Sequence, residues 1–483
     1  MRKHNLSMLL DLYEMTMANG IFQSDMRDTI TYFDMFFRRV PDKGGFAIMA
    51  GLEQLIEYFE NLRFTEEDIN YLRSLNLFCE EFLDYLKNFK FECDVWAVPE
   101  GTPIFPMEPI VTVKGPAIQA FLVETMVLLT INHQSLIATK ANRICSVAGT
   151  RPVLEFGARR AHGYDAAYYG ARAAIIGGCK GTSNVKTGQD FGAPVSGTMA
   201  HSWVQLFPNE YTAFKTYAEK YPDSCTLLID TFNVLKSGLP NAIKCFDEVL
   251  KPKGYRPKGV RIDSGDIAYL SKKIRKALDE AGYPDCAIVV SNSLDEYLIK
   301  ELDTQGAKIS SFGVGERLIT ASSEAVFGGV YKLAAVEYPN GKIVPKIKVS
   351  ENIAKITLPG VKIPWRLYDN ETGKAIADVI CLNDEKIDDT KPYEIFDPVH
   401  TWKRKTVTNF TAKKLQIKLC EKGKIVYTSP SVSEISTYRK QCVENLWDEV
   451  LRFENPHNYY VDLSQKLWDL RQELLSQKSK GEN

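Results

Sequence analysis

Short apolar runs alternate with amphipathic segments in the middle of the chain, between about residues 150 and 335. The runs at 226–229 and 287–290 have the length and composition of buried strands, whereas residues 267–281 carry apolar side chains at helical spacing. Strands that alternate with helices predict a parallel sheet. Because a polar tip follows each strand, we expect the sheet to close into a barrel, since an open doubly wound sheet gathers its site at one switch point.

The regions on either side of this alternation have different patterns. Residues 5–90 read mainly as helices, and residues 94–113 are rich in proline and β-branched residues, which indicates a small antiparallel unit. A strongly apolar helix is expected at about 117–147. After residue 340 the chain is β-rich, and it ends in a polar helix from about residue 464. The patterns predict three segments: 1–148, 149–340 and 341–483.

One strand-to-turn segment combines an aromatic ring with two fixed positive charges. Residues 152–163 run from an apolar strand into a glycine turn that carries Phe156, Arg159 and Arg160. A ring beside guanidinium groups suits a flat anion. Other strand ends carry acids, hydroxyls and arginines, so we expect one active-site face. These further strand ends lie at 226–233, 259–266 and 287–293.

The composition argues against several classes of partner. Lysine and arginine total 60 against 61 acidic residues, a net charge of -1, so no overall field would attract nucleic acid or an anionic membrane. The ten cysteines are scattered without a C-x-x-C pair, which argues against structural zinc and a disulfide framework and favours reduced thiols in a cytoplasmic protein. No apolar run reaches the roughly 18 residues of a membrane span. We therefore expect a globular enzyme with locally concentrated positive charge.

Two strand ends have the residues of a phosphate and sugar site. In Arg261-Ile-Asp263-Ser-Gly-Asp a strand turns into a helix, whose free N–H groups suit a phosphate, and the aspartate can coordinate phosphate-bound magnesium. Gly313 and Gly315 leave backbone amides open to a phosphate. Both patterns also fit ordinary structure, because an aspartate or serine can simply cap the helix and glycines can simply form the turn.

Three further candidates have equally ordinary alternatives. Ser183 lies in the small-residue turn Lys-Gly-Thr-Ser-Asn, which allows close contact either with a ligand or with a packed helix. His201, in Ser-Gly-Thr-Met-Ala-His-Ser, has no second histidine at metal-ligand spacing, so it is a candidate acid, base or nucleophile, or a structural histidine. Tyr13 lies on a short predicted amphipathic helix and would by itself be a packing residue.

Taken together, these segments resemble nicotinate phosphoribosyltransferase. The resemblance covers most of the chain and depends on the ordered set, since no single motif is specific. It implies an irregular α/β barrel and a smaller α+β domain formed by the N-terminal region and the segment after the barrel, in a homodimer with shared active sites. The matching segments are the Asp-Leu-Tyr helix at 11–13, EFGARRAHG, KGTSNV, SGTMAHS, LLIDTFN, VRIDSGD, SFGVGERL, Lys348-Val-Ser350 and the turn at 359–362.

The resemblance also implies a reaction of NAD salvage. The ring nitrogen of nicotinate attacks C1 of phosphoribosyl pyrophosphate, and pyrophosphate leaves as its magnesium complex. ATP hydrolysis is coupled through a phosphorylated histidine, whose position matches His201. The expected roles are Phe156 and Tyr13 on the two faces of the pyridine ring, Arg159 and Arg261 on carboxylate and phosphate oxygens, Asp230 and Asp263 on ribose hydroxyls and magnesium, and Gly313 and Gly315 on the 5-phosphate.

Three alternatives compete with this interpretation. Nicotinamide phosphoribosyltransferase shares most strand-end motifs but carries an aspartate after the lysine-glycine-threonine turn, where this chain has Ser183. An aspartate would repel a carboxylate substrate, which favours nicotinate here. The decarboxylating quinolinate enzyme is shorter and lacks the histidine motif. A non-catalytic scaffold protein would have no reason to keep Arg261, Asp263 and His201 together.

Overall fold

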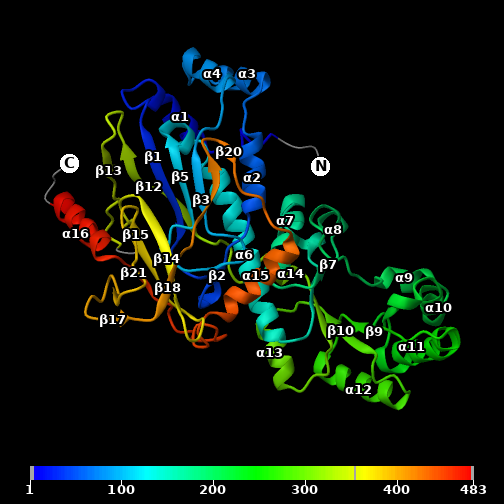
Figure 1. Ribbon diagram of the computed structural model, residues 1–483. Coiled ribbons are helices and arrows are strands. Elements are labelled where there is room, and N and C mark those ends of the chain that lie inside the picture. Colours follow the sequence, from blue (N-terminus) through cyan, green and yellow to red (C-terminus); the bar gives the residue numbers. More distant parts are fainter. Residues whose placement is uncertain (1–4, 353–354, 480–483) are drawn as a thin grey trace. The chain divides into compact units, whose positions relative to one another are not determined.

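The computed structural model describes residues 5–352 and 355–479 of the chain, which divide into two compact units (Figure 1). The central unit is built from Ile137–Ala325 and Ser431–Ser436. The flanking unit is built from the described residues of Met1–Leu136, Val326–Pro430 and Thr437–Asn483. Segments from both ends of the chain therefore fold together in the flanking unit.

The central unit contains a six-stranded parallel sheet in the order β7-β6-β11-β10-β9-β8, with helices in the connections (Figure 1). The predicted parallel sheet is confirmed, and so is the helix at 267–281. The strands are β6 (Val153–Glu155), β7 (Gly181–Thr182), β8 (Thr226–Leu228), β9 (Gly259–Ile262), β10 (Ala287–Ser291) and β11 (Ser311–Val314). The α-helices are α7 (Tyr164–Gly177), α8 (Val185–Phe191), α9 (His201–Leu206), α10 (Glu210–Lys220), α11 (Leu239–Cys245), α12 (Ile267–Glu280), α13 (Glu296–Thr304) and α14 (Glu316–Ile319).

The sheet does not close, so the predicted closed barrel is wrong. Within the described residues, β7 and β8 are the two ends of the strand order and do not pair. β7 is only two residues long, and its outer edge is occupied by a parallel bridge between Thr182 and Val195. The Thr182 N–H donates to the Pro194 carbonyl at 2.9 Å. The backbone groups that β7 could offer to a further strand are thus used by an irregular segment.

The flanking unit is organised around an antiparallel sheet in the order β13-β12-β1-β5-β3-β19-β20 (Figure 1). β1 pairs with both β5 and β12 and thereby joins the N-terminal region to the segment after residue 325. The antiparallel pairing of β3 with β5 confirms the unit predicted at 94–113. The strands are β1 (Ile30–Phe37), β3 (Asp94–Ala97), β5 (Val111–Pro116), β12 (Gly329–Glu337), β13 (Ile343–Pro345), β19 (Ile417–Glu421) and β20 (Lys424–Ile425).

A second sheet in this unit has the order β18-β14-β15-β21, and two short two-stranded antiparallel sheets, β2 with β4 and β16 with β17, complete the strands. The predicted final helix is confirmed as α16 (Gln465–Ser479). The remaining strands are β2 (Ala47–Ile48), β4 (Pro103–Ile104), β14 (Lys362–Asp369), β15 (Ala375–Leu382), β16 (Tyr393–Phe396), β17 (Arg404–Val407), β18 (Phe410–Lys414) and β21 (Val461–Leu463). The remaining helices are α1 (Leu12–Phe22), α2 (Leu52–Asn61), α3 (Glu66–Ser74), α4 (Glu80–Lys87), α5 (Ala117–Phe121), α6 (Glu124–Ala148) and α15 (Val432–Glu444).

Two sequence expectations about membranes and cysteines can be compared with the structure. The stretch Ala117–Ala148, which contains α5 and α6, is long and apolar enough to cross a membrane. However, 61% of its most apolar window is buried inside the protein, as in the core helix of a globular fold. All ten cysteines lie in the described part of the chain, and all are free thiols.

Candidate active site

Arg261 is held at the end of β9 by four separate acceptors, one of which is the Met199 carbonyl, 3.4 Å from a terminal nitrogen. Its Nε donates to the Ser291 hydroxyl at 2.8 Å, one terminal nitrogen donates to the Thr198 hydroxyl at 2.8 Å, and the other reaches Asp263 Oδ1 at 3.2 Å. The side chain is only 12% exposed. These contacts use four of the five N–H donors of the guanidinium, so one N–H and the fixed positive charge remain for an anionic ligand.

Asp263 connects this guanidinium to the candidate histidine. Its Oδ1 also accepts a hydrogen bond from the Ser291 hydroxyl, and its Oδ2 lies 3.9 Å from His201 Nε2. The other ring nitrogen of His201, Nδ1, lies 3.1 Å from the Thr231 hydroxyl oxygen. Since 40% of the His201 side chain is exposed, the ring is accessible to a reactant while a hydroxyl orients it.

Asp230, at the end of the neighbouring strand β8, has one satisfied and one unsatisfied oxygen. Its Oδ2 accepts from the Asp263 N–H and the Ser264 hydroxyl, both at 2.7 Å. Its Oδ1 is buried and has no hydrogen-bond partner. A buried polar atom without a partner points to a ligand hydroxyl or an ordered water.

The residues of this face cannot surround a metal ion by themselves. Across residues 5–352 and 355–479 there is no group of three or more histidine, cysteine, aspartate or glutamate side chains that could hold a metal.

The helix-capping alternative for Asp263 and Ser264 is not what the structure shows. The N-cap of α12 is Asp266, whose side chain accepts from the Tyr269 N–H at 2.9 Å. The side chains of Asp263 and Ser264 point instead to the strand-end network. Asp263 is therefore available for a role other than capping.

Phe156 and the two glycines form one close-packed turn. The Phe156 N–H donates to the Val314 carbonyl at 2.8 Å, which ties the end of β6 to β11. A Cβ atom built on Gly313 would lie 2.5 Å from two carbon atoms of the Phe156 ring, and one on Gly315 would lie 3.3 Å from the Phe156 carbonyl oxygen. Gly313 is thus needed to accommodate the ring, whatever else its backbone binds. The Arg261 guanidinium carbon lies 5.9 Å from the centre of the same ring.

Ser183 and Arg159 are exposed at the same strand ends. Ser183 follows β7, and its N–H donates to the Glu155 carbonyl at 2.9 Å. Arg159 lies in the short 3₁₀ turn Ala158–Arg160 after β6, and within the described residues no hydrogen bond or ion pair engages its guanidinium. Its neighbour Arg160 is 3.9 Å from Glu316. Arg159 can therefore reorient toward a bound anion.

The structure also shows supporting residues of the candidate site that the sequence analysis did not assign a role in binding or catalysis. They are neutral hydroxyls and a buried acid, which hold the charged groups in place. Each of them lies inside one of the motifs named above or at a strand end. Their charged and aromatic neighbours are easier to recognise in the sequence as candidate binding residues. These residues are Glu155, Thr182, Thr198, Thr231, Ser264 and Ser291.

Strain is present at the same face, in the turn after β10. Asn292 has a φ of 101° and Ser293 a φ of 46°, conformations that L residues rarely adopt. This turn follows Ser291 directly. Backbone strain of this kind is concentrated at ligand sites, where the surroundings maintain it.

Tyr13 lies in the flanking unit, on α1, and 45% of it is exposed. Partial burial, together with the neighbouring Glu124 and Glu14 carboxylates, raises the pKa of Tyr13 to about 12. Its neighbour Glu14 is fully buried and accepts from the N–H of Thr125 at 3.2 Å and from the hydroxyl of the same residue. Burial raises the pKa of Glu14 to about 7. The phenol is therefore neutral near pH 7 and is carried by an anchored helix.

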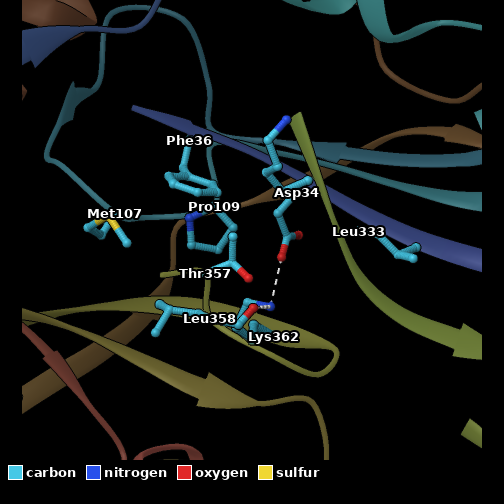
Figure 2. Close-up of a pocket in the computed structure, with 9 residues that line it drawn as sticks. Asp34, Phe36, Met107, Pro109, Leu333, Thr357, Leu358 and Lys362 are labelled. Atoms are coloured by element: carbon cyan, nitrogen blue, oxygen red, sulfur yellow. Dashed lines mark hydrogen bonds and ion pairs between the residues drawn. The ribbon is translucent and has the colours of Figure 1, made fainter. Parts of the chain in front are cut away.

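The turn at 359–362 has a structural role in the flanking unit. Figure 2 shows Lys362 directed at Asp34, and their Nζ and Oδ2 atoms lie 2.8 Å apart with both side chains buried. The ammonium also donates to the carbonyls of Leu358 and Gly360. The other Asp34 oxygen accepts from the Thr112 hydroxyl at 2.8 Å. Lys362 is thus an internal cation that joins the turn to β1.

Comparison with known families places all three parts of the chain in one group. Residues 8–132 match the nicotinate phosphoribosyltransferase N-terminal domain. Residues 152–352 match the nicotinate phosphoribosyltransferase family, and residues 361–471 match the corresponding C-terminal domain. The order of the three matches is the order of the segments described above.

Individual relatives and solved structures agree with this result. The chain is 45% identical to nicotinate phosphoribosyltransferase of Bacillus subtilis over 96% of this chain and 94% of the relative, and 30% identical to the Homo sapiens protein over 98% and 97%. The crystal structure of human nicotinic acid phosphoribosyltransferase superimposes with a TM-score of 0.83 at 29% identity, covering 97% of this chain and 100% of that one. A nicotinate-nucleotide pyrophosphorylase from Pyrococcus furiosus shares the fold, with a TM-score of 0.69 at 24% identity, over 92% of this chain and 99% of that one. This chain belongs to the nicotinate phosphoribosyltransferase family.

Proposed function

We propose that this protein transfers the phosphoribosyl group of phosphoribosyl pyrophosphate to nicotinate. The ring nitrogen of nicotinate attacks C1 of the ribose, the bond from C1 to the pyrophosphate oxygen breaks, and its electron pair leaves with pyrophosphate. The products are nicotinate mononucleotide and pyrophosphate. The observation that carries the proposal is the network of Arg261, Asp263 and His201 at the strand ends of a chain of this family.

Phe156 and Arg261 suit the two chemical parts of nicotinate. A pyridine ring stacked on Phe156 would have the Arg261 guanidinium nearby, since that group lies 5.9 Å from the centre of the phenyl ring. Arg159, exposed on the turn after Phe156, offers a second guanidinium. Arg159 can bind the carboxylate through two parallel hydrogen bonds, which would fix the orientation of the ring nitrogen toward the ribose, while Arg261 offers one N–H and its charge.

Asp230 and Asp263 supply negative charge where positive charge develops on the ribose in the transition state. The unpartnered Oδ1 of Asp230 suits a ribose hydroxyl or a water on phosphate-bound magnesium. Magnesium, when bound, would neutralise the departing pyrophosphate. Gly313 and Gly315 lie beside the Phe156 turn, where their N–H groups are proposed to meet the 5-phosphate.

We further propose that ATP is a co-substrate that phosphorylates His201, and that the reaction serves NAD salvage. The partly exposed ring of His201 beside Asp263 supports this assignment, because a phosphoryl acceptor must be accessible and its ring must be oriented. We also propose a homodimer in which Tyr13 of a second copy covers the pyridine ring. The 45% exposure of Tyr13 supports such a role.

Replacing His201 with alanine should abolish the stimulation by ATP and leave a slow basal reaction. The reason is that nucleophilic attack on the γ-phosphate needs the imidazole, whereas glycosyl transfer uses other groups. Initial rates with and without ATP, and the appearance of an acid-labile phosphoprotein, provide the measurement. Full ATP stimulation of the variant would contradict the assignment.

Replacing Ser183 with aspartate should weaken the use of nicotinate at least about tenfold in kcat/KM, which corresponds to roughly 1.4 kcal/mol of like-charge repulsion. Activity on nicotinamide should rise or stay level, because a carboxylate can accept from the amide. Steady-state kinetics on both substrates check this result. An equal loss on the two substrates would indicate general damage and would argue against a specificity role.

The proposed reaction is tested by incubating the purified protein with nicotinate, phosphoribosyl pyrophosphate and magnesium, with and without ATP. Chromatography should detect nicotinate mononucleotide and pyrophosphate in equal amounts. If neither condition yields the nucleotide, the proposed reaction is wrong.

A further inference from the structure

Glu155 is a fully buried carboxylate at the end of β6, between two turns of the candidate site. One of its oxygens, Oε1, accepts a hydrogen bond from the Gly157 N–H, on the far side of Phe156. The other, Oε2, accepts from the Thr182 hydroxyl at 2.6 Å, on β7. The same side chain therefore holds the Phe156 turn and the strand that precedes Ser183.

The backbone adds a second connection between the same two turns. The Glu155 carbonyl accepts from the Ser183 N–H at 2.9 Å. The Thr182 hydroxyl oxygen, which donates to Glu155, accepts from the Asn184 N–H at 3.0 Å. Ser183 is thus fixed by hydrogen bonds from its own N–H and from both of its neighbours, and all of them lead to Glu155.

The direction of these hydrogen bonds requires an acceptor at both carboxylate oxygens. The Gly157 N–H can only donate, and the Thr182 hydroxyl already accepts from Asn184, so its hydrogen is directed at Glu155. Burial raises the pKa of Glu155, while both hydrogen bonds act in the opposite direction. A glutamine would present an amide group to one of these two donors. The acid is therefore matched to its place by its hydrogen-bonding pattern as well as by its size.

We propose that Glu155 is a positioning residue that sets the separation of Phe156 and Ser183, and through it the preference of the site for nicotinate over nicotinamide. This inference rests on the proposed function. Groups that orient a binding residue through hydrogen bonds commonly change affinity or activity by roughly 10- to 100-fold when they are removed. Glu155 itself does not touch the substrate.

The test uses Glu155→Gln, Thr182→Val and Thr182→Ser in the full-length protein. We expect the first two variants to raise the KM for nicotinate about tenfold and to lower the nicotinate-to-nicotinamide ratio of kcat/KM, with the KM for phosphoribosyl pyrophosphate changed less than about twofold. Thr182→Ser keeps the hydroxyl and should restore the KM. For the double variant Glu155→Gln/Thr182→Val, the KM for nicotinate should be no higher than that of the more affected single variant. The reason is that both substitutions break the same hydrogen bond between Thr182 and Glu155.

Thr187→Val is the matched control. Thr187 is also a fully buried threonine, but its hydroxyl donates to the Tyr168 carbonyl at 3.1 Å, away from Glu155. It should lower the melting temperature and leave the KM for nicotinate unchanged. If Glu155→Gln does not fold, the test depends on Thr182→Val. Valine preserves the shape of the threonine side chain.

Two outcomes separate this inference from the proposed function. An inactive wild-type protein would overturn the function itself. An active wild type whose Thr182→Val and Thr182→Ser variants raise the KM equally, or whose substrate preference is unchanged by Thr182→Val, would overturn the role of Glu155 and leave the function intact.

Discussion

Replacing Asp263 with asparagine is expected to lower kcat at least about 100-fold, the scale seen when one preorganised electrostatic group is removed from a transition state. Asp263 accepts from Ser291 and Arg261 through one oxygen and faces His201 Nε2 at 3.9 Å with the other. An amide keeps the shape but loses the negative charge that is proposed to stabilise the positive charge developing on the ribose. Stopped-time product assays over a range of both substrates measure the effect.

The matched control for this prediction is Asp266→Asn, three positions later in the chain. Asp266 caps α12 through the Tyr269 N–H, and asparagine caps helices about as well as aspartate. We therefore expect near wild-type kcat in the control. A large fall in melting temperature for Asp263→Asn, with unchanged turnover in the folded fraction, would instead assign Asp263 a structural role.

Replacing Asp34 with asparagine is expected to cost about 3–5 kcal/mol of the stability of the flanking unit, because it leaves the buried Lys362 ammonium without its counter-ion. Both side chains are buried, at 6% and 2% exposure, and the ion pair is 2.8 Å long. The two carbonyl acceptors of Lys362 cannot replace a negative charge. Urea unfolding followed by far-UV circular dichroism, with each transition fitted separately, measures the loss.

Asp388→Asn is the control for the effect of burial. Asp388 pairs with Lys391 at the same 2.8 Å distance, but the two side chains are 49% and 76% exposed. Solvent screens an exposed pair, so the control should change stability far less. Equal losses of unfolding free energy for Asp34→Asn and Asp388→Asn would show that burial does not make the Asp34–Lys362 pair more important for stability than an exposed pair.

Those parts of the fold that local periodicity determines could be predicted from the sequence. The parallel sheet follows from alternating strands and helices, and α12 follows from apolar residues at i, i+4 and i+8. Because the strands of a parallel sheet run in the same direction, their carboxyl ends lie at one edge of the sheet. For that reason the sequence alone predicts that Asp230, Arg261 and Asp263 lie close together, and their hydrogen bonds confirm it.

Two features of the fold could not be predicted from the sequence: that the parallel sheet stays open, and that residues 30–37 form strand β1. The physical reasons differ. Closure depends on what pairs with the outer edge of β7, and Val195 occupies part of that edge through a tertiary contact with no periodic signal. β1 lies in a region that reads mainly as helices, although seven of its eight residues are buried and most are aromatic or β-branched. Its identity as a strand comes from pairing with β5 and β12, which are far away in the sequence.

The sequence predicts hydroxyl side chains at the strand ends but not which of them hold the charged groups. Thr198 and Ser291 matter because their oxygens lie 2.8 Å from the Arg261 nitrogens, and neutral hydroxyls are too common in loops to be singled out by pattern alone. Gly313 is similar. Its lack of a side chain suggests close approach of a phosphate to its N–H, and the structure adds a second reason, because a Cβ atom at Gly313 would collide with the Phe156 ring.

The central claim is that the strand-end face uses the acid and not the amide of the pyridine substrate. The most direct measurement compares kcat/KM for nicotinate and for nicotinamide on the wild-type protein, at fixed phosphoribosyl pyrophosphate, magnesium and ATP. With Arg159 and Arg261 available to a carboxylate and Ser183 in place of an acid, we predict a preference for nicotinate of at least about 100-fold, or roughly 2.7 kcal/mol. Equal values for the two substrates, or a preference for nicotinamide, would contradict the account.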